Sequence, residues 1–323
     1  MKGDEDGPAG CPLHGVDVGD MLAICRRTFQ HPRPDGTLPR QFHEKAHACL
    51  SGTLHIDPPD NPALRHGLFA QAGRYPVTIR FSSSFFSDDE VPDGRGMAIR
   101  LTGVEGAPGG QQDFILISQA TAPFRQSADA AALFTALDGV PRMTPFSLLS
   151  RPYILPGFDP RRIRWHYLRL LFTTGFSHAR RRGLHRLAYH SITPYRLGES
   201  ATKYICRPDA GAWDGLRGYR RSFTERLQAA LDRGGFGFDF CLQPRLSESD
   251  PIDDAGVIWK GPDFPVGRLE ISAQDVSAGL ALSDGLAFNP WNSLPDHEPL
   301  GSLNAIRRIA YADSAKRRNA ANS

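Results

Sequence analysis

The pattern of hydrophobic and polar positions predicts strands in the first third of the chain and again after residue 200. Short runs in which apolar and polar residues alternate, or in which β-branched and aromatic residues cluster, are typical of strands. On this criterion we expect strands at Leu50–Ile56, Tyr75–Ser82, Gly96–Leu101, Asp113–Ser118, Ala201–Cys206, Phe236–Leu242 and Gly267–Ile271. The run Asp113–Ser118 is apolar on both faces, which indicates a buried strand.

Apolar residues spaced three and four apart predict helices, which are grouped mainly toward the C-terminal half. The predicted helices are Ser127–Leu137, Arg161–Phe172, Tyr219–Asp232 and Leu303–Arg318. Ser302 precedes the last of them and is expected to act as its N-cap. Strands and helices do not alternate regularly, and no glycine-rich fingerprint follows a strand. A doubly wound nucleotide-binding fold is therefore disfavoured.

The first 36 residues differ from the rest of the chain. They begin with an acidic stretch rich in glycine and proline, and only Met21–Phe29 has an amphipathic pattern. We therefore expect residues 1–36 to form a loosely ordered segment. The stretch lacks the apolar core of a signal peptide, and no run approaches the roughly 18 apolar residues of a membrane span. These features predict a cytoplasmic protein.

Composition excludes several classes of protein. With 40% hydrophobic and 23% charged residues, the chain is too apolar and too weakly charged to be disordered. Its 5 cysteines are odd in number and form no Cys-x-x-Cys pair, which argues against a disulfide framework or a structural zinc site and fits a reducing compartment. The formal charge of +3 is too small to require a nucleic-acid partner, and we expect none.

The positive charge is strongly segregated along the sequence. Residues 161–186 hold 8 arginines and no acidic residue, so the remainder of the chain is net acidic. One interpretation is a solvated face or a subunit contact. The other is a surface that makes weak contact with a membrane through anionic lipid headgroups or fatty-acid carboxylates.

The last predicted helix places Arg307 and Tyr311 four residues apart, and therefore on one face. A guanidinium beside a phenol lowers the pKa of the phenol by favouring the phenolate. A phenolate is a hard anionic ligand suited to Fe(III), and tyrosine is one of the proximal haem ligands that proteins use. Taken alone, the same pattern also fits an ordinary amphipathic helix with solvated arginines.

A second candidate lies near residue 43. Because the pKa of histidine lies near neutrality, a histidine beside a bound metal can take the proton from one oxygen of a peroxide and return it to the leaving oxygen. His43 is the preferred candidate, because Arg40 precedes it by three residues, and His47 is the alternative. A surface histidine in a polar loop is the simpler interpretation of this segment by itself.

The two segments belong to an ordered set. In sequence order the chain contains Arg40-x-x-His43-x-Lys45, Tyr75-Pro-Val-Thr-Ile-Arg80-Phe-Ser82, Asp93-Gly-Arg95-Gly96-Met-Ala-Ile-Arg100 and Arg307-x-x-x-Tyr311-x-Asp313. Together these motifs resemble the haem catalase family. The phrases Gln112-Asp113-Phe114, Thr193-Pro194-Tyr195-Arg196-x-Gly198 and Asn289-Pro-Trp291 are similar to those of the small catalase-related proteins, which lack the long C-terminal extension. The resemblance covers roughly residues 38–318.

This resemblance implies an α+β fold, an antiparallel β-barrel with helices packed around a buried haem b, formed by residues 37–323 as a single domain. It implies that Tyr311 is the proximal ligand, that Arg307 hydrogen-bonds its phenolate, and that His43 is the distal catalytic residue. Arg40 and Arg80 match the arginines that pair with the haem propionates, and Arg318 matches a further arginine near the propionates. Ser82 matches the serine that orients the distal histidine. Guanidinium groups suit propionates because they form bidentate bonds to carboxylates.

One departure from the family pattern concerns the distal side. Catalases place an asparagine, which helps to polarise the peroxide, shortly after the strand that corresponds to Asp113–Ile117. This chain has no asparagine there; Ser118 is the nearest positional match and Gln119 the adjacent alternative. We take Ser118 as the candidate catalytic donor. One well-placed hydrogen-bond donor is worth ~100-fold or more in rate. The replacement of the asparagine by Ser118 therefore argues against fast dismutation of hydrogen peroxide.

The sequence thus predicts a haem-dependent oxidoreductase that breaks down hydrogen peroxide or organic, fatty-acid hydroperoxides by catalase- or peroxidase-type chemistry. Two alternatives remain. One is a haem-binding sensor or storage protein with little turnover, and the other is an enzyme that rearranges fatty-acid hydroperoxides, as the related coral allene oxide synthase does. The resemblance also implies a homo-oligomer, while the shortened chain makes NADPH binding less expected.

Overall fold

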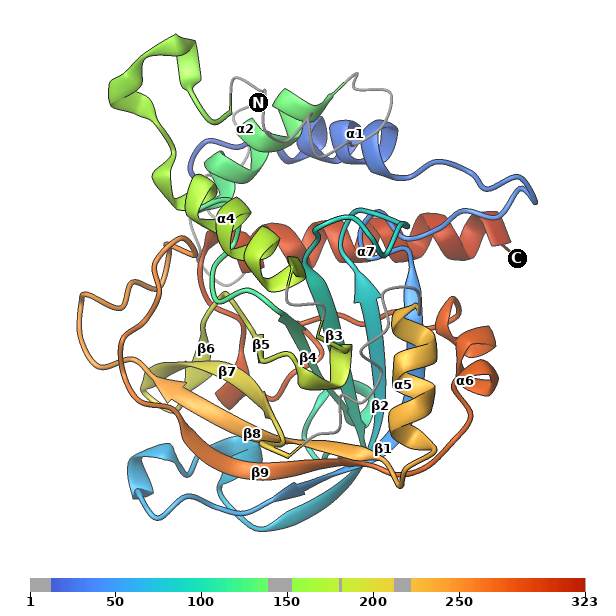
Figure 1. The fold of residues 1–323 in the computed structure, drawn as a ribbon. Coiled ribbons are helices and arrows are strands. Elements are labelled where there is room, and N and C mark those ends of the chain that lie inside the picture. The colour runs from blue at the N-terminus through green and yellow to red at the C-terminus, as the bar shows by residue number, and fades with distance from the viewer. Residues whose placement is uncertain (1–12, 139–152, 180–181, 212–221, 323) are drawn as a thin grey trace.

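A nine-stranded antiparallel sheet dominates the computed structural model, which describes residues 13–138, 153–179, 182–211 and 222–322 (Figure 1). Its strands are β1 (Ala46–Ile56), β2 (Gly73–Ser83), β3 (Arg95–Thr102), β4 (Gln111–Ile117), β5 (Tyr189–His190), β6 (Tyr195–Leu197), β7 (Ser200–Pro208), β8 (Phe236–Pro244) and β9 (Phe264–Ile271). Their order is β5-β4-β3-β2-β1-β9-β8-β7-β6, and β5 also pairs with β7. This second pairing closes eight of the strands into a barrel, with β6 attached to its edge.

The pairing register explains why the predicted alternation folds into a barrel. Leu50 on β1 lies opposite Ile79 on β2, Ile79 opposite Ile99 on β3, and Ile99 opposite Phe114 on β4. Residues that are directly opposite in an antiparallel pair share one face, so these four side chains form a continuous row inside the barrel. All four are buried.

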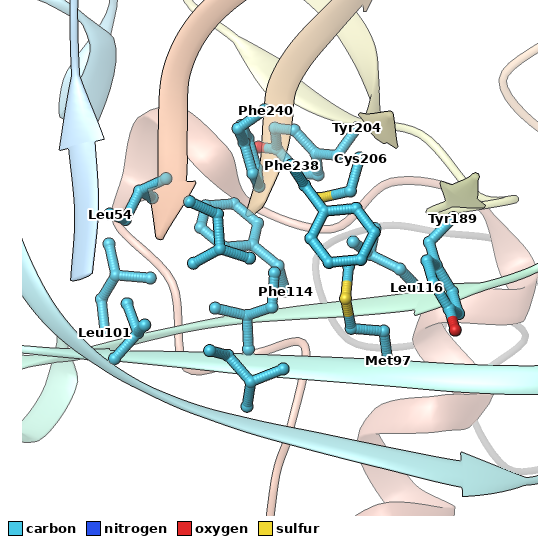
Figure 2. Close-up of a cluster of buried hydrophobic side chains, with 14 of the residues drawn as sticks. Leu54, Met97, Leu101, Phe114, Leu116, Tyr189, Tyr204, Cys206, Phe238 and Phe240 are labelled. Atoms are coloured by element: carbon cyan, nitrogen blue, oxygen red, sulfur yellow. The ribbon is translucent and has the colours of Figure 1, made fainter. Parts of the chain in front are cut away.

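Large side chains fill the inside of the barrel. Figure 2 shows residues from both halves of the sheet meeting there, among them Met97, Leu116, Tyr189, Phe238 and Phe240. The ring centroids of Phe114 and Phe240 are 4.8 Å apart, which is an ordinary packing distance for aromatic pairs. The interior is thus a packed core, and a large ligand must bind outside it.

Six helices of the described chain surround the barrel: α1 (Val18–Phe29), α2 (Ser127–Leu137), α4 (Trp165–Ala179), α5 (Phe223–Leu231), α6 (Val276–Ser283) and α7 (Ser302–Asn322). α5 and α6 pack on the outside of β1, whereas α1, α2, α4 and α7 gather at one end of the barrel (Figure 1). Met21, Phe134, Leu303 and Ile306 join α1, α2 and α7 in a second apolar cluster. None of the described helices combines the length and the hydropathy needed to cross a membrane.

The predicted α+β barrel with packed helices is confirmed, and each predicted strand and helix overlaps an observed one; residues 219–221 of the predicted helix Tyr219–Asp232 lie outside the described residues. The N-cap assignment is wrong: Ser302 is the first residue of α7, and its hydroxyl contacts Asp253 and accepts a hydrogen bond from the Ser127 N–H. Within residues 1–36, α1 buries Met21 and Cys25. The division of the chain at residue 37 stays a prediction.

Two histidines, His190 on β5 and His297 in the turn Pro295–His297, make the stability of the fold sensitive to acid. Burial lowers the pKa of His190 and of His297 from 6.5 to about 4. The unfolded chain therefore takes up these protons at a higher pH than the folded chain does. The stability that the neutral rings contribute is present above pH 6.5 and is lost as the pH falls toward 4.

We expect the free energy of unfolding to fall by up to about 1.4 kcal/mol per pH unit for each histidine in this window. Urea unfolding measured at several pH values between 6.5 and 4 tests this. In the variant His297→Gln the slope should be smaller, while the amide oxygen can still accept the hydrogen bond that the Leu68 N–H donates to His297 Nε2. Equal slopes in the two proteins would contradict the assignment to His297.

Candidate active site

A large cavity lies between the barrel and the helices at one end. It contains about 1630 Å³ of space outside the protein atoms, part of it open to solvent. The cavity volume proper is about 270 Å³, close to the lower end of the ~300–1,000 Å³ that is typical of ligand pockets. Seven of the eight predicted site residues line it: Arg40, His43, Arg80, Ser82, Arg307, Tyr311 and Arg318.

α7 supplies one wall of the cavity. Arg307, Tyr311 and Arg318 follow one another at intervals of four and seven residues, so they share a face of the helix. Arg307 Nη2 lies 3.4 Å from Tyr311 Oη. The other terminal nitrogen of the guanidinium, Nη1, donates hydrogen bonds to Thr193 Oγ1 at 3.1 Å and to Asn304 Oδ1 at 3.0 Å.

The charge of Arg307 is secured by its neighbours. Burial lowers the pKa of this guanidinium, but attraction from Tyr311 and Tyr195 outweighs burial and leaves the pKa above its ordinary value. A permanent positive charge therefore lies beside the Tyr311 oxygen. An arginine in this position stabilises a phenolate, which is the form of tyrosine that binds a ferric ion.

His43 also lines the cavity, and it lies between two serines. Its Nδ1 is 3.0 Å from Ser82 Oγ, and its Nε2 is 3.5 Å from Ser84 Oγ. The backbone of His43 has a left-handed φ of 57°, and its N–H donates to the Ser84 carbonyl at 3.0 Å. The hydrogen bond to Ser84 and the contact with Ser82 hold the residue in this uncommon conformation.

Burial, followed by repulsion from Arg80, Arg307 and Arg40, lowers the pKa of His43 from 6.5 to about 3. The ring is therefore neutral at physiological pH. A neutral imidazole has one nitrogen that donates and one that accepts a hydrogen bond. If the Nδ1 proton is donated to Ser82, Nε2 is free to accept a proton from a ligand in the cavity.

Gly96 on β3 makes room for this histidine. A Cβ atom at position 96 would lie 2.6 Å from both Cε1 and Nδ1 of His43 and 2.7 Å from Ser82 Oγ. These distances are far below van der Waals contact, so the imidazole packs directly against the backbone of β3. The absence of a side chain at this position fixes where the ring can lie.

We expect Gly96→Ala to lower the free energy of unfolding by about 1–3 kcal/mol, the usual cost of overpacking. The methyl group must displace His43, Ser82 or both. Urea unfolding measures the loss, and Gly175→Ala is the matched control because a Cβ at that helical position meets nothing within 4 Å. The control should be neutral or slightly stabilising. An unchanged stability of Gly96→Ala would show that His43 does not pack on this strand.

Three arginines that line the cavity form a cationic cluster. Burial, followed by repulsion from Arg80 and Arg318, lowers the pKa of Arg40 to about 9. Burial lowers the pKa of Arg80 to about 10, and it also lowers that of Arg318. Asp284 lies 3.4 Å from Arg40, but it is also 2.8 Å from Arg33.

Backbone oxygens satisfy many of the donors in this cluster, yet they carry no charge. Arg80 donates to the His43 and Glu44 carbonyls at 2.9 and 3.0 Å, and Arg318 donates to the Leu286 carbonyl at 3.0 Å. Buried positive charges repel one another, which raises the free energy of the folded state unless anions neutralise them. The cluster is thus suited to a ligand that brings carboxylates.

The structure does not bring Ser118 together with the other predicted residues. Its Oγ accepts a hydrogen bond from the Arg95 N–H at 3.0 Å and lies 3.3 Å from Gln119 Oε1. Gln119 in turn donates to Thr174 Oγ1 at 3.2 Å. Ile117 lines the cavity instead, and neither Ser118 nor Gln119 does.

His47 also lies away from the cavity. It is fully buried on β1, with Nε2 at 2.8 Å from Ser83 Oγ and its ring against Phe223. His43, and not the alternative His47, therefore lines the same cavity as Tyr311.

Sequence reasoning missed four residues that build this site: Ser84, Gly96, Thr193 and Asn304. A signal for Ser84 was present, because residues two apart near the end of a strand share a face and Ser82 was already a candidate. Gly96 and Thr193 fall within the motifs that carried the resemblance, but no role was attached to them. For Asn304 the sequence offers only its position three residues before Arg307 on the same helix.

Comparison with known proteins identifies the fold. No protein-family model matches the chain, and no curated protein matches its sequence. Solved structures do match: a fungal catalase has a TM-score of 0.66 at 16% identity, over 96% of this chain and 65% of the catalase. The chain has a catalase-related core fold.

Other catalases give the same result. A bacterial catalase matches 99% of the chain with a TM-score of 0.60 at 17% identity, and catalase A from Saccharomyces cerevisiae matches 97% with a TM-score of 0.60 at 15% identity. The chain spans 63% and 70% of these two catalases. At such low identity the likeness establishes the arrangement of barrel and helices, and the chemistry must be argued from the residues.

The residues of this catalase-related cavity fit a haem. A haem has a ferric ion that takes a phenolate ligand, a broad apolar macrocycle and two propionates. The cavity offers Tyr311 with Arg307 beside it, apolar walls that include Ile115, Ile117 and Ile306, and the cluster of Arg40, Arg80 and Arg318. Among the described residues, no group of three His, Cys, Asp or Glu side chains could hold a bare metal ion.

Proposed function

We propose that this protein binds haem b in the cavity and acts on peroxides as a haem-dependent oxidoreductase. The observation that supports the proposal is that one cavity is lined both by Tyr311 with Arg307 beside it and by His43 with Ser82 and Ser84 beside it. Motifs that lie nearly 270 residues apart in the sequence meet there.

In this proposal Tyr311 is the iron ligand, and the Arg307 guanidinium lies beside its oxygen. Arg40, Arg80 and Arg318 hold the propionates by charge-assisted hydrogen bonds. A haem held in this way supplies the iron redox chemistry that cleaves the O–O bond of a peroxide.

His43 moves the proton. Its neutral Nε2 accepts the proton of the peroxide oxygen that approaches it and then donates the proton to the oxygen that leaves, while Ser82 at Nδ1 keeps the ring in the required orientation. Ser84 lies on the Nε2 side, where its hydroxyl can donate a hydrogen bond to the peroxide. We assign to Ser84 the donor role that the sequence had suggested for Ser118.

The apolar walls favour an organic hydroperoxide. Phe42, Phe85, Phe124 and Phe134 line the cavity, and the ring centroids of Phe42 and Phe134 are 5.5 Å apart. Burying a hydrocarbon chain against these rings gains roughly 25 cal/mol per Å² of apolar surface, an energy that hydrogen peroxide cannot use. We therefore infer that fatty-acid hydroperoxides are better substrates than hydrogen peroxide.

The test is to load the full chain with haem and to compare hydrogen peroxide with a fatty-acid hydroperoxide, following oxygen release, donor oxidation and the identity of the product. We expect a higher kcat/KM for the fatty-acid hydroperoxide. An alcohol product indicates peroxidase chemistry, whereas an epoxide product formed with loss of one water indicates a conversion like that of the coral allene oxide synthase. Oxygen release from hydrogen peroxide as the faster reaction would contradict the inferred substrate.

A second candidate function is a haem-binding sensor or storage protein with little turnover. One observation favours it. Catalases have a polarising asparagine shortly after the strand that corresponds to β4, whereas here the apolar Ile117 lines the cavity at the end of that strand. This function predicts that haem binds but that neither peroxide is consumed. Measured turnover of either peroxide rejects it.

A further inference from the structure

Three aromatic side chains project from the outer face of α4. Trp165, Phe172 and Phe176 are 69%, 75% and 53% exposed. Their spacing of seven and four residues places them on one stripe of the helix. The rings of Phe172 and Phe176 are nearly parallel, with centroids 6.4 Å apart, so they form a continuous apolar surface.

These aromatic residues are not needed to attach the helix. The opposite face of α4 packs through Tyr167 and Leu170 against Leu133 and Leu137 of α2. The helix thus has an apolar inner face and also an apolar stripe turned outward. Scattered exposed apolar residues are common, but a stripe of large rings on one helix marks an interaction surface.

The surroundings of this stripe are strongly cationic. The sequence contains no acidic residue between positions 160 and 198. Arg161, Arg162, Arg169 and Arg182 are exposed around α4. The carboxylate of Asp159 lies 3.7 Å from Arg162, which is a loose and exposed pair that neutralises little of this charge.

We propose that this surface, which consists of Trp165, Phe172 and Phe176 with Arg161, Arg162, Arg169 and Arg182, docks on an anionic lipid bilayer. Aromatic rings prefer the headgroup level of a membrane, and arginines are attracted to anionic lipids. With 15 residues and a cationic border, α4 is suited to lie along the surface, parallel to the membrane plane.

Charge argues for a bilayer over a second copy of the chain. In a twofold dimer the same patch meets itself, so these arginines would face one another without carboxylates between them. An anionic bilayer offers negative charge over the whole patch together with an apolar layer for the rings. The lipid surface is therefore the occupant that matches both properties.

The position of α4 links this surface to the cavity. Phe124 packs against the apolar cluster in which α4 meets α2, and it also lines the cavity. Docking would thus bring an apolar wall of the cavity close to the bilayer, where fatty-acid hydroperoxides reside. This link to the substrate rests on the proposed function, whereas the docking itself does not.

The docking is tested by sedimenting the full chain with vesicles of phosphatidylcholine, with and without phosphatidylserine, in the absence of any peroxide. We expect binding to the phosphatidylserine vesicles that weakens as salt is added. The substitutions Arg161→Gln, Arg162→Gln and Arg182→Gln together should lower the affinity on the order of a hundredfold, at roughly fivefold for each arginine. Phe172→Ser with Phe176→Ser should also weaken binding.

Matched controls lie elsewhere on the surface. Leu282 on α6 is 69% exposed, and Arg74 on β2 is exposed, so Leu282→Ser and Arg74→Gln change the same chemistry away from α4. Both controls should bind as the unmodified protein does. Circular dichroism verifies that the α4 variants are folded.

Two outcomes would overturn the proposal. One is equal binding of the unmodified protein to vesicles with and without phosphatidylserine, or equal binding of the α4 variants and the controls. The other is self-association in sedimentation velocity that Phe172→Ser with Phe176→Ser abolishes, in a protein that does not bind vesicles. The latter would assign the stripe to a contact between copies. Peroxide turnover is measured separately, so a failure of docking leaves the proposed function standing.

Discussion

Tyr311→Phe is expected to remove the proposed iron ligand and to give the largest loss of peroxide turnover of any single substitution. The phenyl ring keeps the volume and the packing but has no oxygen beside Arg307, whose Nη2 now lies 3.4 Å from the hydroxyl. Loss of a group that merely supports a metal ligand costs ~10–100-fold in affinity or activity, and loss of the ligand itself should cost more. The visible absorption spectrum of the haem-loaded protein should change at the same time.

The matched control is Tyr75→Phe, a hydroxyl deletion on β2 at a residue that does not line the cavity. Its spectrum and turnover should equal those of the unmodified protein. A Tyr311→Phe variant that binds haem with an unchanged spectrum would refute the assignment of the ligand.

His43→Gln is expected to slow the reaction with peroxide by ~10²–10⁴-fold, the usual contribution of a positioned acid–base group. Haem binding should persist, because in the proposed function α7 and the arginine cluster hold the haem and His43 does not. Since burial and the nearby arginines lower the pKa of His43 to about 3, the unmodified enzyme should show no loss of rate attributable to this ring between pH 7 and about 5. Stopped-flow mixing of the haem-loaded protein with a peroxide measures both effects.

His47→Gln tests the alternative assignment. His47 is fully buried against Ser83 and does not line the cavity, so turnover per bound haem should be preserved in this variant. If His47→Gln slowed the reaction more than His43→Gln, the distal roles of the two histidines would have to be exchanged.

The sequence predicted those parts of the site that depend on local geometry. Arg307 and Tyr311 are four residues apart on one helix, and helical spacing alone brings their side chains together. The arginine cluster could be predicted only through the resemblance to catalases, because Arg40, Arg80 and Arg318 come from a loop, a strand and a helix. No spacing rule relates residues on separate elements before the fold is known.

Ser118 shows why the position of a residue in the sequence does not determine which way its side chain points. β4 ends at Ile117, which lines the cavity, and side chains of successive residues in an extended chain point to opposite sides. Ser118 is therefore turned toward Arg95. Ser84 points into the cavity for the same reason, since it is two residues beyond Ser82.

The closure of the barrel could not be predicted either. It depends on β5, which has two residues and therefore no periodicity to detect. α6 was missed for a different reason, because its sequence, Val276–Ser283, is apolar on most sides and lacks the polar face on which helix prediction relies.

The arrangement of the cavity has a consequence for folding. Arg40 and His43 precede the first strand of the barrel, and Tyr311 lies on the helix that follows the last one. The cavity thus exists only when both ends of the described fold have come together. A ligand that binds there binds the native state alone, and by mass action it stabilises barrel and helices as one cooperative unit. A bound cofactor would then contact both ends of the fold and hold them together. The rate of cofactor binding would report when folding is complete.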